Sequence, residues 1–223
     1  MASSGHTCTL KVTGSAVAVT AEAAAVLVPY TVYRITNAAR RVIDPASSVT
    51  VKVNGVAVGA GTYSLNYLFG AVTFGSALSA LDVVTLDFSY LPLLSLAEVR
   101  SFELSVSSAM LETTVMDSAT VARTKMAGLQ DASGNFAGLD PLTTDLDPGA
   151  GAVRVFQEWF DAGANRLIEV GFPGGTKFRA FAVLPDVKVS SGFDALVEST
   201  VNWQASARTG TGRSDASAFG IGT

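Results

Sequence analysis

Along most of this chain, apolar and polar residues alternate one by one over short stretches. The clearest stretch is "LVESTVNWQASARTG" (Leu196–Gly210). Val197, Val201 and Trp203 fall on its apolar parity, and the other parity is wholly polar, with Glu198, Thr200, Asn202, Gln204 and Ser206. Such alternation predicts a β-strand with one buried and one wet face. The stretches "AEVRSFELSVSSAM" (97–110) and "LQDASGNFAG" (129–138) follow the same pattern.

The first half of the chain predicts β-hairpins. In "VTVKVNGVAV" (49–58), two apolar alternations flank Asn54-Gly55, a strong signal for a tight hairpin turn. "TYSLNYLFGAVTF" (62–74) repeats the arrangement around Phe69-Gly70, and Asp82–Tyr90 is a further strand. The uncharged run Thr62–Leu81 is therefore interpreted as two strands and a turn rather than a membrane span, and a soluble chain is expected.

One helix is predicted, over residues 149–162. Asp147 can cap it, Pro148 suits its first turn, Phe156 and Phe160 share one face, and Gly163 stands where helices commonly end. Further strands are predicted in "NRLIEVGF", "TKFRAFAVLP" and "DVKVSS", with "GFPGGT" as a hairpin turn. We therefore expect a mainly β protein: a β-sandwich or barrel with one packed α-helix. Its expected divisions are an N-terminal β-rich module (1–97), either a separate outer domain or interwoven with the sandwich, a β-sandwich (98–209) and a flexible tail (210–223).

The composition favours self-association and argues against several functions. Charged residues make up 15% of the chain, against about 25% in ordinary globular proteins, so much of the surface is expected to be buried against neighbouring copies. A net charge of −4 gives no electrostatic grip on nucleic acid. The single cysteine, Cys8, fits assembly in a reducing compartment, and "MASSGHTC" has no features of a signal peptide.

Residues for catalysis or metal binding are scarce. His6 is the sole histidine, and His6 with Cys8 supplies too few ligands for a metal site. Glu103, Glu158, Glu169 and Glu198 could in principle form a carboxylate pair, but each is better explained as a solvated side chain on a helix or on the wet face of a strand. Core packing explains Trp159 and Trp203 better than a sugar-binding platform does. We therefore expect no enzyme activity, no metal and no cofactor.

The second half resembles the tail tube proteins of long-tailed bacteriophages, which are related in fold to the tube proteins of type VI secretion systems. The resemblance rests on "SVSSAMLETTVMDSATVARTKMAGLQDASGNFAGL" and "FRAFAVLPDVKVSSGFDALVESTVNWQASARTGTG". The family pattern of a polar hairpin loop and a Gly-Leu-x-Asp-x-Ser-Gly strand is met by Gly128, Leu129, Asp131, Ser133 and Gly134. The resemblance covers about half of the chain, roughly Glu98–Gly212.

This resemblance implies that six subunits close a ring around a 24-stranded inner β-barrel and that rings stack into a hollow tube. At about 4.8 Å per strand and a tilt near 40°, such a barrel has a backbone circumference of about 150 Å and a backbone diameter of about 48 Å, which leaves room for duplex DNA inside the side chains of the wall. The polar faces of four strands would line the channel. These residues are Ser101, Glu103, Ser105, Ser107, Asp131, Ser133, Asn135, Lys188, Ser190, Glu198, Thr200, Asn202 and Gln204.

The implied lining is mildly acidic, because Glu103, Asp131 and Glu198 stand against Lys188. An acidic wall cannot release counterions from phosphates, so DNA would slide along it. The resemblance also implies a ring-stacking loop with Glu112, Asp117, Arg123 and Lys125.

The expected role is thus a structural virion protein, the major tail tube subunit. It would assemble in the bacterial host cytoplasm, contact the tape measure, tail terminator and tail tip proteins, pass double-stranded DNA transiently, and bind no membrane. The alternatives are a tail-completion ring, a contractile-injection tube protein and a carbohydrate-binding β-sandwich.

Overall fold

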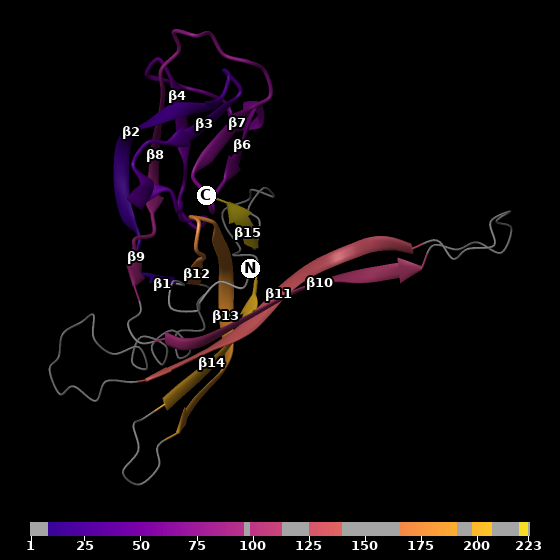
Figure 1. Cartoon of the computed structure of the whole chain (residues 1–223). Coiled ribbons are helices and arrows are strands. Elements are labelled where there is room, and N and C mark those ends of the chain that lie inside the picture. Colours follow the sequence, from indigo (N-terminus) through magenta and orange to yellow (C-terminus); the bar gives the residue numbers. More distant parts are fainter. Residues whose placement is uncertain are drawn as a thin grey trace, which may run out of the picture.

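A computed structural model describes residues 9–95, 99–112, 125–139, 166–190, 198–206 and 219–222. These residues form two antiparallel β-sheets (Figure 1). The helical elements among them are two 3₁₀ turns, η2 (Ala38–Arg40) and η3 (Ala60–Thr62). The protein is mainly β, as the alternation predicts. The predicted helix at 149–162 lies outside the described residues.

A seven-stranded sheet contains most of the N-terminal half, in the order β5-β4-β8-β2-β3-β7-β6. Its strands are β2 (Val17–Val28), β3 (Val32–Ile35), β4 (Thr50–Val53), β5 (Val56–Ala57), β6 (Tyr63–Asn66), β7 (Ala71–Phe74) and β8 (Val84–Tyr90). The predicted hairpin turn between β4 and β5 is confirmed: Asn54 and Gly55 both have positive φ, 50° and 81°. Asn54 further stabilises this turn, because its side chain bonds Asp82 and the amide of Val83.

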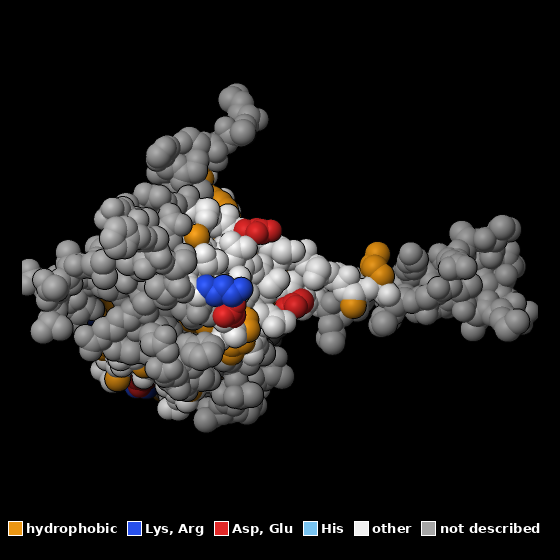
Figure 2. Space-filling view, turned by 90° about the horizontal axis from the view of Figure 1, so that it is seen from below, with side chains coloured by type: hydrophobic (Ala, Val, Ile, Leu, Met, Phe, Trp, Pro, Cys, Tyr) orange, Lys and Arg blue, Asp and Glu red, His pale blue; other side chains and the backbone are white. Residues whose placement is uncertain are grey.

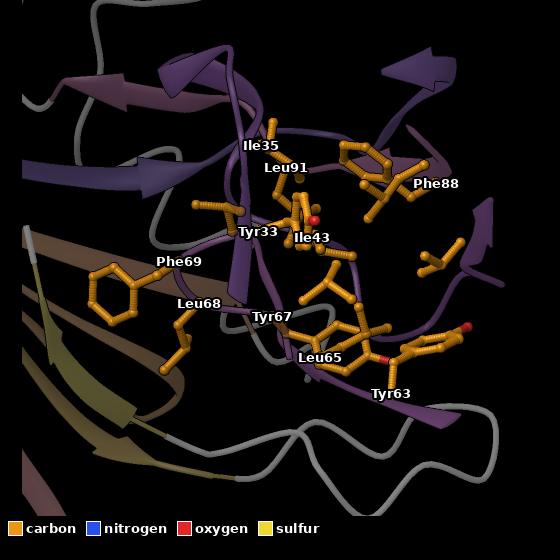
Figure 3. Packing of buried hydrophobic residues seen from close by; sticks show 14 of the residues in the cluster. Tyr33, Ile35, Ile43, Tyr63, Leu65, Tyr67, Leu68, Phe69, Phe88 and Leu91 are labelled. Carbon is orange, nitrogen blue, oxygen red and sulfur yellow. The ribbon is translucent and has the colours of Figure 1, made fainter. Parts of the chain in front are cut away.

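The core of this half lies on one face of the seven-stranded sheet. Tyr33, Ile35 and Leu86 point into it from the strands, and Val42 and Ile43 cover them from the connection between β3 and β4. Figure 3 shows this packing, with Leu68 and Phe69 directed toward strands of the other sheet. Alternate strand positions are therefore buried, which is the periodicity that the sequence shows.

An eight-stranded sheet contains the C-terminal half, in the order β10-β11-β14-β13-β12-β1-β9, with β15 paired to β13. Its strands are β1 (Thr9–Thr13), β9 (Leu93–Ser95), β10 (Val99–Glu112), β11 (Lys125–Leu139), β12 (Arg166–Gly171), β13 (Lys177–Ser190), β14 (Glu198–Ala205) and β15 (Phe219–Gly222). The antiparallel pair β10–β11 extends beyond the other strands to one side (Figure 1).

The seven-stranded sheet is an insertion into the eight-stranded one. β1 pairs with β9 in the register Lys11↔Ser95 to Thr13↔Leu93, and β1 also pairs with β12. The chain thus leaves the larger sheet after Thr13 and returns to it at Leu93. Both β1 and β9 fall within residues 1–97, yet β1 takes its other partner, β12, from the C-terminal half.

The two sheets meet at a buried ion pair. The Arg179 guanidinium contacts Glu169 (Nε–Oε2 2.7 Å, Nη2–Oε2 2.5 Å) and also donates to the carbonyl oxygen of Leu68. It lies over the ring of Phe69, 5.0 Å from the centroid. Leu167 and Phe181 of the larger sheet pack into the core of the smaller one. The two halves are therefore joined by apolar packing and by the contacts of the buried Arg179 guanidinium with Leu68 and Phe69.

Two sequence-based expectations were wrong here. Glu169 is not on a wet strand face: it is 1% exposed, because β12 is covered on both faces. "TKFRAFAVLP" and "DVKVSS" are not separate strands but parts of β13. Pro185 does not end β13. The register of β13 against β14 shifts between Val183 and Asp186, and such a bulge tolerates the missing N–H of proline.

Candidate functional site

A polar surface extends over one face of four neighbouring strands, β10, β11, β14 and β13. Their register places one row of residues straight across these strands: Glu103↔Asn135, Asn135↔Asn202 and Asn202↔Asp186. Neighbouring rows contain Ser105, Ser133 and Gln204 on one side and Ser101, Thr200 and Lys188 on the other. We call this surface, with Ser107 and Asp131, the polar face. Figure 2 views the molecule from this end: the described part is largely uncharged, with scattered carboxylates.

Side-chain amides hold the carboxylates of the polar face. Asn135 donates to Glu103 (Nδ2–Oε2 2.8 Å) and Gln204 donates to Asp131 (Nε2–Oδ2 3.2 Å). Asn202 lies 3.4 Å from Asp186 (Nδ2–Oδ2), whose carboxylate also contacts the Lys188 ammonium at 3.3 Å. An amide orients a carboxylate without neutralising it. The described part of this face therefore carries three carboxylates and one ammonium.

The residues predicted to share one face do so wherever their side chains are described. Ser101, Glu103, Ser105, Ser107, Asp131, Lys188 and Gln204 are exposed, and Ser133, Asn135, Thr200 and Asn202 are half-buried. Ser190 and Glu198 are register partners at the end of the β13–β14 pair, and their side chains lie outside the description. In the predicted stacking loop, Glu112 and Lys125 are register partners at the end of β10–β11, while Asp117 and Arg123 lie outside the described residues.

Asp186 is a member of the polar face that the sequence analysis missed. It shares the parity of Lys188 on β13, and its carboxylate contacts both Asn202 and Lys188. Pro185 suggested a break in the strand directly before it, which hid the relation. The signal was present in the spacing, since Asp186, Lys188 and Ser190 are two residues apart.

The opposite face of these strands is apolar. Trp203 is 1% exposed and stacks on Phe102 with 6.5 Å between ring centroids and 11° between planes. Ala132, Phe136 and Val201 are buried beside it. The prediction that Trp203 is a core residue is confirmed, which removes it as a sugar-binding platform. Trp159 and Glu158 lie outside the described residues.

The four-stranded unit has two open edges. Within the described ranges, β10 pairs with β11 alone. On the other side, β12 pairs with β13 as far as Ala182, and no described strand continues along Val183–Ser190 on that side. Unpaired backbone N–H and C=O groups at a sheet edge are a template for pairing with another strand. Exposed apolar side chains accompany the β10 edge: Val106 is 52% and Met110 66% exposed.

The titratable side chains of the described residues form no metal site. None of their His, Cys, Asp and Glu side chains gather in threes as a metal site would require, and none of their helices is long and apolar enough to span a membrane. His6 and Cys8 lie outside the description. Glu169, a candidate in a carboxylate pair, is instead bonded to Arg179.

Comparison with known proteins gives similarity to solved structures alone: no family model and no curated protein matches the sequence. One similar chain belongs to the virion of a native gene transfer agent particle, with a TM-score of 0.45, 15% identity, and coverage of 59% of this chain and 89% of that one. Another belongs to the tail of an empty gene transfer agent particle with C6 symmetry, with a TM-score of 0.44, 18% identity, and coverage of 59% and 87%.

Proposed function

We propose that this chain is the repeating subunit of a hollow tube, the major tail tube protein of a long-tailed phage or phage-like particle. The observation that supports the proposal is the four-stranded unit β10-β11-β14-β13. It has a polar face, an apolar face and an open edge on each side. A unit of this kind satisfies the free backbone groups at its edges by pairing with copies of itself.

The direction of the strands suits ring closure. Each of the four strands is antiparallel to its neighbour, so β10 and β13 run in opposite directions. A copy rotated about a central axis keeps the same strand directions, so its β10 meets β13 antiparallel. Because the unit has an even number of strands, the alternation continues around a closed barrel, which has no free edge. Six copies, the number that the resemblance to tail tube proteins implies, give the 24 strands expected from the sequence.

The polar face is directed to the channel in this arrangement, and the apolar face to the packed exterior of the barrel. Buried residues on the apolar side, such as Phe136, Val201 and Trp203, support this orientation. A lining of hydroxyls, amides and net negative charge offers phosphates few cations, so DNA passes without being bound. The function is a passage for double-stranded DNA, in a virion tail, in contact with copies of the chain and with other tail proteins.

The test is electron microscopy of the purified full-length chain, with the concentration raised stepwise. Hollow filaments support the proposal if their bore is narrower than the estimated backbone diameter of the barrel, because side chains line it, yet wide enough for duplex DNA. Discrete rings that never stack indicate the tail-completion ring instead, and a protein that stays monomeric at every concentration overturns the proposal. Glycan binding by such a monomer would favour the carbohydrate-binding alternative. Contraction of an added sheath would identify a contractile-injection tube.

A further inference from the structure

The two open edges can meet in a small number of registers. Polar positions on β10 are odd-numbered (Ser101, Glu103, Ser105), and on β13 they are even-numbered (Asp186, Lys188). A slip of one residue would turn every side chain of the joined strand to the wrong face, so allowed registers differ by two residues. This step rests on the proposed function, because it takes a second copy of the chain as the occupant of each edge.

Charge distinguishes among the allowed registers. One of them places Glu103 directly opposite Asp186, and like charges directly opposite each other destabilise a strand pair. Sliding β13 by two residues, so that Lys188 takes the place of Asp186, puts Glu103 opposite Lys188 and Asp186 opposite Ser105. Sliding β13 by two more residues in the same direction puts Lys188 opposite Ser105. Glu103 is then diagonal to Lys188, still within reach of a long side chain. In these two registers Glu103 meets Lys188 without lying directly opposite Asp186.

We infer that Lys188 of one copy and Glu103 of the next form an ion pair across each seam, and that this pair selects the register of ring closure. Both residues lie on the outermost strands of the four-stranded unit, one at each edge. Lys188 is the one basic residue among the described side chains of the polar face, and its side chain is 71% exposed. Glu103 is exposed and accepts the Asn135 amide through Oε2, which leaves Oε1 for a second donor.

The neighbours of each residue permit the contact. Within one copy, the Lys188 ammonium lies 3.3 Å from Asp186, and both side chains are open to solvent. Because the Lys188 ammonium stays exposed in this contact, it can also donate to a second carboxylate. At the seam, Lys188 would lie between Asp186 of its own strand and Glu103 of the next copy. The ammonium would then separate two carboxylates that would otherwise repel each other.

The test is charge reversal with exchange between copies. Glu103→Lys and Lys188→Glu each place like charges at every seam, and each is expected to raise the protein concentration needed for assembly about tenfold or more. The double variant restores charge complementarity and is expected to assemble like the wild type. An equimolar mixture of the two single variants is also expected to assemble, because copies of the two variants that alternate around the ring bring opposite charges together at every seam.

The control is Lys177→Glu, which makes the same charge change on β13 at a position flanked by β12 and β15. It is expected to leave the assembly concentration unchanged. Wild-type assembly with no effect of either reversal, or no rescue in the mixture, overturns the seam pair and leaves the tube proposal intact. A wild-type chain that stays monomeric overturns the tube proposal itself.

Discussion

The side-chain amide of Asn135 donates a 2.8 Å hydrogen bond to the carboxylate of Glu103, its register partner across β10–β11. Gln204 holds Asp131 in the same way. In both contacts a neutral donor fixes a carboxylate that a lysine or arginine would have neutralised. The polar face thus combines ordered side chains with retained negative charge, and this combination leads to the first prediction.

Asp131→Lys is expected to make assembled tubes retain duplex DNA. Each added cation can displace counterions from a phosphate, and each such contact steepens the salt dependence of binding by about 0.9 in the logarithmic slope. Filter retention of labelled DNA across a salt series measures this. Asp131→Asn is the control, since it removes the negative charge without adding a positive one. Equal release of DNA by the lysine variant and the wild type would contradict an inward-facing polar face.

Gly134→Ala is expected to abolish assembly while the seven-stranded sheet stays folded. A Cβ at Gly134 would lie 2.0 Å from the carbonyl oxygen of Glu103 and 2.9 Å from the Trp203 ring, so β10 and β11 could not pair as they do. This close approach accounts for a glycine at position 134 of this chain. Near-UV circular dichroism monitors the folding of the variant, and electron microscopy monitors its assembly. Gly61→Ala, where nothing lies within 4 Å, should match the wild type in both.

Glu169→Gln is expected to reduce the free energy of unfolding by about 3–5 kcal/mol, because it leaves the buried Arg179 charge without its partner. The exposed fractions are 1% for Glu169 and 3% for Arg179. Urea unfolding measures the change. Lys11→Met is the matched control: Lys11 contacts the same carboxylate at 3.7 Å but is a third exposed, so its loss is expected to cost less than about 1 kcal/mol. Equal effects would show that burial is not the cause.

Asp87 predicts a pH dependence at acid pH. A hydrogen bond from Lys52, then one from the backbone N–H of Ala21, then the Lys52 charge, hold the pKa of Asp87 below its ordinary value. A carboxylate with a lowered folded pKa stabilises the protein above its unfolded pKa, and this contribution disappears as pH falls through the folded value. Asp87→Asn is therefore expected to lower Tm at neutral pH and to lose this difference in acid. A difference that persists at the lowest pH would contradict the assignment.

Sequence alternation predicted the two-faced strands well because those strands have one wet face. β10, β11 and β14 each present serines, amides or carboxylates on one parity and Phe, Val or Trp on the other. The hairpin at Asn54-Gly55 was predictable for a local reason: both residues adopt positive φ. Features that depend only on neighbouring residues, such as strand faces and tight turns, could therefore be predicted from the sequence.

The errors occur where distant segments decide the outcome. The sequence suggests that Glu169 is a solvated carboxylate, but the pairing of β12 with β13 places Arg179 beside it. Asp186 was missed because Pro185 signals a break, whereas a bulge in the β13–β14 ladder accommodates it. The pairing of β1 with β9, across the whole seven-stranded sheet, leaves no trace in local periodicity.

That pairing gives the chain a practical use. Because Thr13 and Leu93 are register partners, a short turn could join them, and the intervening segment could be exchanged for a cargo domain genetically. Any such graft must shield Leu167 and Phe181, which the native segment keeps from water. With that condition met, the proposed tube would display foreign modules at regular intervals along its length.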